Sequence, residues 1–466
     1  MKRTHCCGEL RAAQAHQDVL LQGWVHRRRD HGGLIFIDLR DVTGLVQVLF
    51  SPEKKELFAL AKDLRAEFVL EIQGQVRQRP SGTENPNLAT GEVEIVAEKL
   101  TVLNRAETPP FEIEDQTNAS EEVRLAYRYI DLRRPSMQKN LVLRHRVSQM
   151  VRAFLDERHF VEVETPILTK STPEGARDYL VPSRLNFGKF YALPQSPQLF
   201  KQLLMVAGLD RYFQISRCFR DEDLRADRQP EFTQIDIELS FPDEEEIYRL
   251  TSGLFQAIFK EAESLIGKKL NVTFTQMTYA EVIRRFGTDS PDARFDMELQ
   301  DLTELFRECN FKIFETVAKG GGSVLALNAP GGARLSDKQI DILRLRAQDG
   351  KPGAKDLTAL KFEKETLLGS VTKHFKKEVL VQVAEKLGSR EGDLVLMVAD
   401  ASIDVARRSL GRVRDKLKDR TYLPELLKGN EAKCAFVWVT EFPLFEKDEE
   451  GNLTSSHHPF TNLHPE

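Results

Sequence analysis

Hydrophobic and polar residues alternate along two neighbouring stretches, residues 212–220 and 232–239, and predict an antiparallel pair of strands. In the second stretch Ile235, Ile237 and Leu239 share one face. Its other face carries Phe232, Gln234, Asp236 and Glu238. The segment between the stretches, 221–231, is dense in charges of both signs. The pattern therefore predicts a strand, a charged loop and a second strand with one polar face.

The polar face has the dimensions and chemistry of a ligand site. At about 3.3 Å per residue, Phe232 and Asp236 lie roughly 13 Å apart on one face, about the span of an aminoacyl-adenylate. Phe232 can stack on a purine, Asp236 can bind an amine, and Arg220 at the end of the first strand can bind a phosphate. The two-residue alternation by itself is more often explained by a hairpin with a solvent-exposed tip. The order Arg220-Asp221-Glu222, with Phe232 ten residues after Glu222, favours the ligand site.

The N-terminal part alternates in short runs that predict a small β-barrel. The strands are expected at 19–25, 34–40, 45–50, 68–76 and 92–100, with a helix over 53–64. Five strands and one helix are typical of an OB-fold, which often binds oligonucleotides on its sheet face.

Side chains on the outer face of this barrel suit RNA. If Ile35 and Ile37 face the core, Phe36 faces outward and can stack on a base. The same parity turns Gln47 and Glu94 outward, where they can bind base edges. A single exposed phenylalanine is ordinary on any protein surface. The basic run at 26–29 favours RNA.

The middle of the chain alternates between loops and helical patterns. Residues 104–135 contain prolines and change from acidic to basic, which indicates a hinge. Helical spacing over 141–158 leads into a short strand at 161–163. A loop at Thr172–Ala176 is placed to close over a substrate. We expect a helix to begin at Ser196-Pro197, with proline at its first position and Gln198 and Lys201 on one face. A lysine at such a position is ordinarily solvated.

Composition restricts the class of protein. With 466 residues the chain is too long for one core, and 30% charged residues with a net charge of −5 describe an ordinary globular protein. RNA contacts must then come from local basic patches. The five cysteines lack metal-ligand spacing and disulfide density, so a reducing cytosol is expected. No signal peptide or long apolar run suggests secretion or a membrane.

The stretch RDEDLRADRQPEFTQID closely resembles motif 2 of the class II aminoacyl-tRNA synthetases, in detail that of bacterial-type aspartyl-tRNA synthetases. The resemblance runs from about Cys6 to the end of the chain. It implies an α+β multidomain protein: an OB-fold barrel, then an antiparallel catalytic sheet with an inserted α/β domain. The expected domains are 1–105 (anticodon-binding OB-fold), 106–140 (hinge), 141–287 (catalytic, motifs 1 and 2), 288–423 (insertion) and 424–466 (return to the catalytic domain). Motif 1, the helix and strand over 141–163, implies a homodimer. In the insertion we find no chemistry of its own.

The same resemblance implies roles for individual residues. Lys201 would pair with the side-chain carboxylate of aspartate and Asp236 would take its ammonium. An uncharged or cationic substrate would leave Lys201 unpaired, which disfavours asparaginyl and lysyl synthetases. The aspartate-binding residues would be Glu174, Gln198, Lys201, Arg220, Asp236 and His457 of the HHPF element. The ATP-binding residues would be Arg220, Asp221, Glu222, Gln229 and Phe232, with Arg220 the catalytic one and Mg²⁺ bridging the phosphates. Two adjacent histidines can equally be a metal pair or a surface loop, and a metal is the least favoured reading here.

The resemblance also concerns tRNA. Arg29, Phe36, Gln47 and Glu94 match the positions that bind the anticodon. His31 and Gly82 match the residues of members that charge both tRNA(Asp) and tRNA(Asn). In ordinary terms the two residues belong to a turn and a loop. We expect relaxed tRNA choice.

Family members continue past the position of Glu466, through a magnesium-binding glutamate, an arginine that pairs with the substrate, and motif 3 with its γ-phosphate arginine. We therefore expect this sequence to be a C-terminally truncated synthetase. A non-catalytic RNA-binding or regulatory protein built from synthetase parts is the alternative.

Overall fold

The computed structural model describes residues 3–172, 174–223, 228–350, 352–430, 433–447 and 452–456. The chain divides into two compact units, residues 1–145 and 146–466, and the boundary falls inside the long helix α4 (Pro135–Asp156). In the described part no helix is long and apolar enough to cross a membrane.

The first unit contains a closed five-stranded barrel with the strand order β1-β2-β3-β5-β4. Its elements are β1 Asp18–His31, β2 Leu34–Asp41, β3 Gly44–Phe50, α1 Lys55–Lys62, β4 Val69–Gln78 and β5 Val93–Asn104. The apolar residues of each strand fill the interior, among them the fully buried Ile35, Ile37 and Leu39. The predicted OB-fold is confirmed.

After the barrel come two short helices, α2 (Glu121–Ala126) and α3 (Arg128–Asp131). The carboxylate of Asp131 is fully buried and is neutralised by Arg128 and Arg134, at 2.6 and 2.8 Å. Because a buried unpaired charge is costly, these ion pairs fix the chain just before α4. The short 3-10 helices Cys7–Glu9 and Ala12–Gln14 precede the barrel.

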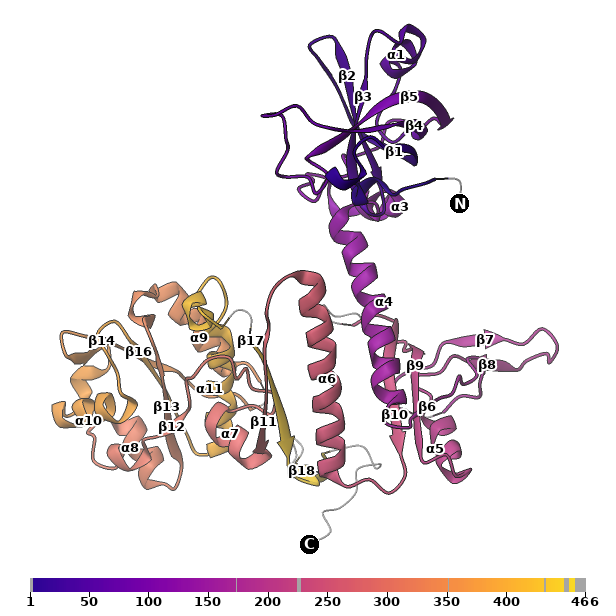
Figure 1. Cartoon of the computed structure of the whole chain (residues 1–466). Coiled ribbons are helices and arrows are strands. Elements are labelled where there is room, and N and C mark those ends of the chain that lie inside the picture. The colour runs from indigo at the N-terminus through magenta and orange to yellow at the C-terminus, as the bar shows by residue number, and fades with distance from the viewer. Residues whose placement is uncertain are drawn as a thin grey trace. The chain divides into compact units, whose positions relative to one another are not determined.

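The second unit begins with a three-stranded sheet in the order β10-β9-β6 (Figure 1). Its strands are β6 Val161–Glu162, β9 Arg211–Phe219 and β10 Glu231–Leu239. One face packs against α4 and α6 (Glu244–Ile266) through a cluster that includes Val151, Leu155, Phe213 and Leu254. The strand pair predicted from alternation is present, and its apolar face is the one that is covered.

Smaller elements flank this sheet. They are β7 Leu180–Pro182, β8 Phe190–Ala192, α5 Gln198–Val206, β11 Asn271–Thr278, α7 Tyr279–Phe286, β17 Lys433–Thr440, β18 Phe445–Lys447 and β19 Leu453–Ser455. β11 and β17 pair in parallel although their first residues, Asn271 and Lys433, are 162 positions apart, so the chain leaves this sheet and later returns beside the strand it left.

Between β11 and β17 lies a separate five-stranded sheet, in the order β12-β13-β16-β14-β15. Its strands are β12 Gln300–Asp301, β13 Ser323–Ala329, β14 Thr358–Glu363, β15 Thr366–Leu368 and β16 Leu394–Asp400. The helices are α8 Lys312–Lys319, α9 Asp337–Gln348, α10 Lys377–Leu387 and α11 Ile403–Leu417. α9 and α11 share one apolar cluster with the sheet, and α8 and α10 share the other. This layered part occupies the stretch expected to be an insertion, and the exact boundaries stay a prediction.

Candidate functional site

The polar face of β9 and β10 carries the predicted ligand-binding residues. Their antiparallel register places Phe232 opposite Cys218 and Asp236 opposite Gln214. Because side chains alternate along a strand, Phe232 and Asp236 share a face and Ile235 and Ile237 the other. The aromatic end and the carboxylate end of the predicted site therefore lie on one surface, away from the cluster behind the sheet.

Lys201 on α5 meets Asp236 on this face. The Lys201 Nζ donates to Asp236 Oδ1 at 2.8 Å and lies 3.4 Å from Glu238 Oε2. Lys201 is 9% exposed and Asp236 8%. The structure pairs Lys201 with Asp236, which were expected to bind the side-chain carboxylate and the ammonium of one substrate. It also brings Glu238 to Lys201, a residue that the sequence placed on this face without a role.

One carboxylate oxygen of this cluster has no partner. Asp236 Oδ2 is buried and makes no hydrogen bond within the described residues. Burial raises the pKa of the neighbouring Tyr212, and the charge and proximity of the Asp236 carboxylate raise that pKa further, while the Tyr212 hydroxyl donates its one proton to Gln214 Oε1 at 2.9 Å. A buried acceptor without a donor is costly, so the site is suited to a ligand that brings a cation or an N–H group.

At the other end of the face, Arg220 lies over the Phe232 ring, with its guanidinium carbon 5.1 Å from the ring centroid. Arg177 pairs with Asp221, Nε to Oδ2, at 3.9 Å. Arg228 pairs with Glu222 at 2.7 Å. The predicted phosphate-binding and ring-stacking residues are thus neighbours, and the acidic residues that follow β9 are held by arginines.

A loop beside this polar face is held by two residues that precede α5. Glu174 accepts from Ser196 Oγ at 2.6 Å and from Thr172 Oγ1 at 3.0 Å. Gln195, which the sequence did not single out, exchanges hydrogen bonds with the backbone of Ala176. Pro197 is the N-cap of α5 rather than its first helical residue, so that expectation was off by one position.

Three other predicted contacts are placed less specifically. Gln198 opens α5 half-buried, and Gln229 is exposed after the charged loop. His457 lies outside the described residues. Among those that are described, no group of three or more His, Cys, Asp or Glu could hold a metal ion.

On the barrel, three of the four predicted anticodon residues, Arg29, Gln47 and Glu94, belong to one hydrogen-bonded network. Arg29 donates to Asp38 at 2.6 Å and to Gln47 at 3.3 Å, and Gln47 donates to Glu94 at 2.9 Å. Arg77 completes it at Glu94, 2.5 Å away. The register places Phe36 beside Arg29 on the same face.

Gln47 and Glu94 face outward, as the alternation predicts, but they are not open to solvent. They are on the outer face but only 8% and 3% exposed, because their neighbours on the same face pair with them. Arg79, which is also buried, has an Nη2 atom without a partner among the described residues. An RNA base could therefore bind Gln47 or Glu94 only by displacing the side chains that are hydrogen-bonded to them.

The two residues linked to tRNA choice are both at the surface. His31 ends β1 and is exposed. Gly82 has a φ of +86° with no atom close to where a Cβ would stand. Its backbone conformation alone therefore favours glycine, whatever its role in tRNA binding.

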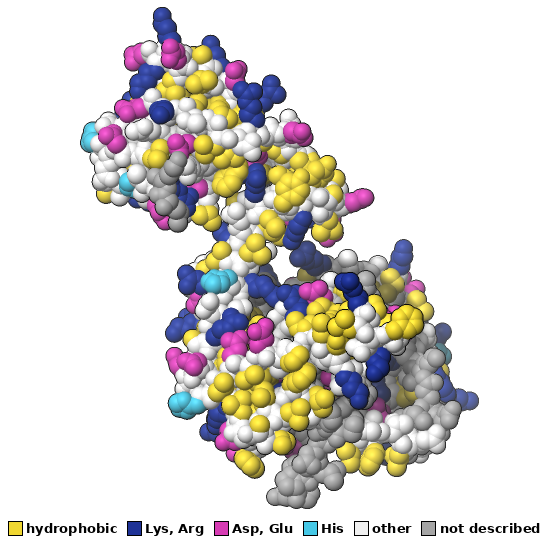
Figure 2. Space-filling model, turned by 90° about the vertical axis from the view of Figure 1, so that its right-hand side faces the viewer, with side chains coloured by type: hydrophobic (Ala, Val, Ile, Leu, Met, Phe, Trp, Pro, Cys, Tyr) yellow, Lys and Arg dark blue, Asp and Glu magenta, His cyan; other side chains and the backbone are white. Residues whose placement is uncertain are grey.

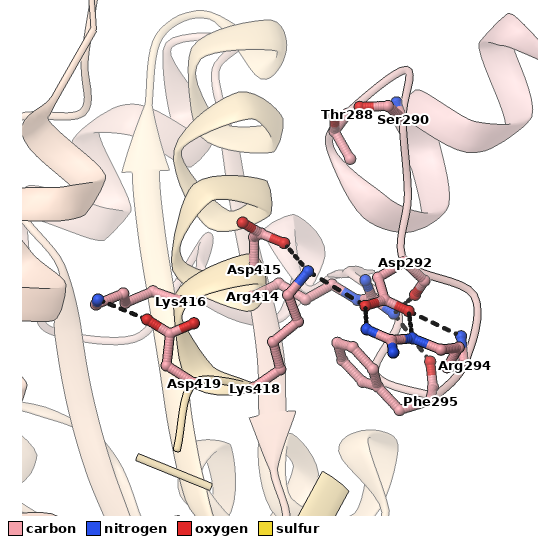
Figure 3. A network of polar contacts seen from close by, with 10 residues as sticks. All are labelled: Thr288, Ser290, Asp292, Arg294, Phe295, Arg414, Asp415, Lys416, Lys418 and Asp419. Carbon is pink, nitrogen blue, oxygen red and sulfur yellow. Dashed lines mark hydrogen bonds and ion pairs between the residues drawn. The ribbon is translucent and has the colours of Figure 1, made fainter. Parts of the chain in front are cut away.

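A second polar network joins α11 to the segment that precedes the five-stranded sheet (Figure 3). Arg414 donates to the backbone oxygens of Met297, Phe295 and Asp292, at 2.8 to 3.0 Å. Burial by itself would raise the pKa of Asp292, but hydrogen bonds from Arg294 and Lys418 hold it well below its usual range. Beside the network lies a crevice of about 480 Å³. Its lining includes arginines, among them Arg412 and Arg414, and acidic residues, among them Asp292 and Asp415.

Comparison with known proteins shows the family of this chain. A family model for tRNA synthetases class II (D, K and N) matches residues 120–466, and one for the OB-fold nucleic acid binding domain matches 19–103. An "Aspartate--tRNA(Asp/Asn) ligase" of Heliobacterium modesticaldum is 52% identical over 463 residues, 99% of this chain and 75% of that protein. An "Aspartate--tRNA ligase" of Geobacillus kaustophilus is 53% identical over 464 residues, 99% of this chain and 77% of that protein.

Among solved structures, the asparaginyl-tRNA synthetase of Pyrococcus horikoshii complexed with asparaginyl-adenylate has a similar fold. The TM-score is 0.54 at 18% identity, covering 89% of this chain and 96% of that one. At this identity the likeness concerns the fold alone.

Proposed function

Because the chain belongs to the class II tRNA synthetases of the D, K and N group, we propose that it ligates L-aspartate to tRNA with ATP, through an aspartyl-adenylate. The observation that carries the proposal is the buried Lys201, which faces Asp236 and Glu238 on the same polar face as Arg220 and Phe232. An amino acid with a second carboxylate fits a buried lysine, and an ammonium fits the unpartnered Asp236 oxygen.

The reaction has two steps. An oxygen of the α-carboxylate of aspartate attacks the α-phosphorus of ATP, the bond to the β-phosphate breaks, and pyrophosphate leaves. A hydroxyl of the 3′-terminal ribose of tRNA then attacks the carbonyl carbon, and AMP leaves with the electrons of the broken bond.

The residues of this chain bind and orient the reactants. Lys201 takes the side-chain carboxylate of aspartate and Asp236 takes its ammonium, with Glu174 and Gln198 beside them. Arg220 neutralises the charge that develops on the α-phosphate, and Phe232 stacks on adenine. Asp221, Glu222 and Gln229 contact ATP, and His457 contacts the substrate carboxylate. Mg²⁺ would enter with the ATP phosphates and neutralise part of their charge.

The barrel would bind the anticodon through Arg29, Phe36, Gln47 and Glu94. The exposed His31 and Gly82 support charging of tRNA(Asn) beside tRNA(Asp). Aspartylation of a tRNA(Asn) transcript tests this choice, and a failure to charge it under conditions that charge tRNA(Asp) would contradict it.

A homodimer is part of the proposal. Hydrophobic side chains gather in the lower part of the face in Figure 2, the side on which Figure 1 shows α5 and the β7–β8 hairpin. The exposed apolar residues of these elements are Leu180, Leu185, Phe187, Phe190, Leu199, Leu203 and Val206. Exposed apolar surface of this kind supports contact with a second copy. As a supplier of charged tRNA, the protein would act in the cytoplasm.

A non-catalytic RNA-binding role is not favoured, because the ligases named above align with 99% of this chain.

ATP–pyrophosphate exchange with the purified protein tests the proposal. We expect exchange that depends on aspartate, with lysine and asparagine far weaker, and a loss of about 100-fold or more in Arg220→Ala. Exchange that is equal with lysine, or that survives unchanged in Arg220→Ala, would contradict it.

A further inference from the structure

Gln195 lies buried between the start of α5 and the loop that carries Glu174. It is only 2% exposed. Its Oε1 accepts from the Ala176 N–H at 3.0 Å, and its Nε2 donates to the Ala176 carbonyl at 2.8 Å. The same Nε2 donates to Asp178 Oδ1 at 2.5 Å. The amide therefore pairs with Ala176 as a neighbouring strand would.

These bonds act on the residue that would contact the substrate. Ala176 is two residues from Glu174, and Ser196, next to Gln195, donates to Glu174 at 2.6 Å. Five residues after Ser196, helix α5 carries Lys201, which pairs with Asp236. The segment 174–178 and Lys201 are thus attached to one short stretch of chain.

The far end of the segment is fixed as well. The Asp221 N–H donates to the Arg177 carbonyl at 3.0 Å, a single bridge between the loop and the residue after Arg220. The Gln195 amide thus pairs with one residue of the segment while the Asp221 backbone pairs with the next.

We propose that Gln195 is a positioning residue for aspartate binding: it fixes Ala176, and through it Glu174, relative to Lys201. The inference rests on the proposed function and assigns a part of that site for which no role was expected. A side-chain amide can donate to and accept from one peptide group at the same time, which a carboxylate or an aliphatic side chain cannot do, so glutamate and leucine cannot replace glutamine here.

A purely structural role of Gln195 predicts a different effect of its substitution. If Gln195 only satisfied buried backbone groups, its loss would lower stability and leave the affinity for aspartate unchanged. A positioning role changes the KM for aspartate and leaves the turnover rate and the KM for ATP nearly unaffected.

The test is Gln195→Glu, measured by pyrophosphate exchange. A carboxylate can accept from Ala176 but cannot donate to its carbonyl, and it faces Asp178. We expect the KM for aspartate to rise about 10-fold or more, with kcat within about threefold and the KM for ATP within about twofold. Gln202→Glu, on the exposed side of α5, is the matched control and should be unchanged.

A second substitution provides the rescue. Asp178→Asn supplies an amide that can donate to the new carboxylate. The KM of the double variant for aspartate should therefore be at least about threefold lower than that of Gln195→Glu alone. A structural defect would instead add to the first. If Gln195→Glu fails to fold, Gln195→Asn, whose shorter side chain cannot reach both groups, takes its place with the same expected rise.

Calorimetric binding of L-aspartate separates the two proposals. If the unsubstituted protein binds no aspartate, the proposed function fails. If it binds aspartate and Gln195→Glu binds it equally well, with an unchanged KM, the role of Gln195 is overturned and the proposed function stands.

Discussion

Lys201 and Arg414 are two buried cations in the same unit, and their partners differ in kind. Lys201 is paired with the carboxylates of Asp236 and Glu238, and the second oxygen of Asp236 has no donor among the residues that the structure describes. Arg414, only 2% exposed, is held by three backbone carbonyls and lies over the rings of Phe286 and Phe295, 4.8 and 4.1 Å from their centroids.

The difference separates binding from structure. Carbonyls belong to the folded backbone and cannot leave, so Arg414 ties α11 to residues 292–297 permanently (Figure 3). Burial lowers the pKa of Arg414 to about 10, which still leaves it charged at neutral pH. A carboxylate partner can be exchanged for the carboxylate of a ligand at little net cost in charge. Equal burial thus indicates a site only where the partners are exchangeable.

The largest effect is expected for Lys201→Met. Aspartate-dependent exchange should fall about 1,000-fold, because the substrate carboxylate would be buried without a counter-charge, at a cost of several kcal/mol. The melting temperature should fall as well, because the buried Asp236 carboxylate loses its counter-charge, so exchange is compared at a temperature at which both proteins are folded. Lys260→Met, an exposed lysine of α6, is the control. Exchange near the unsubstituted rate would show that Lys201 is not a substrate contact.

Arg414→Met should produce the converse result. The unfolding free energy should fall by about 3 kcal/mol, because three buried carbonyls lose their donor. The KM for aspartate of the folded protein should stay within about twofold. Urea denaturation followed by circular dichroism measures the change, with the exposed Arg408→Met on the same helix as control. A loss of unfolding free energy below about 1 kcal/mol would show that the bonds from Arg414 to backbone carbonyls do not make it a structural residue.

The barrel network provides a third case, in which buried groups are satisfied internally. Glu94→Gln should lower kcat/KM for tRNA about 10- to 100-fold, since both Arg77 and Gln47 lose a charged partner. Pyrophosphate exchange should be unchanged, because the substitution is in the tRNA-binding unit. Parallel assays of charging and exchange measure the two effects. An equal loss in both would indicate damage beyond tRNA binding.

The smallest effect concerns acid stability. The folded pKa of Asp292 is depressed, so its charge stabilises the fold fully above its unfolded pKa, near 3.9. This contribution is lost as the pH falls from there towards the folded value. Asp292→Asn should therefore be less stable than the unsubstituted protein at pH 7, and the gap should narrow below about pH 4. Melting curves across this range measure the gap, and a gap independent of pH would rule out the charge as its cause.

The sequence by itself determined much of this protein. Alternation located the barrel strands and the two strands of the site, and the charged loop between β9 and β10 indicated the family. These features are local: a side chain's face on a strand follows from its position alone, so Phe232 and Asp236 could be placed on one surface without coordinates.

Only the tertiary structure decided how these residues are partnered. Lys201 and Asp236 are 35 positions apart, Gln195 and Ala176 are 19, and Gln47 and Glu94 are 47. Periodicity is blind to such pairs, because they depend on how separate elements pack. For the same reason the pattern showed Gln47 and Glu94 facing outward but not that their neighbours bury them, and it did not show that Gln195 holds the loop of Glu174.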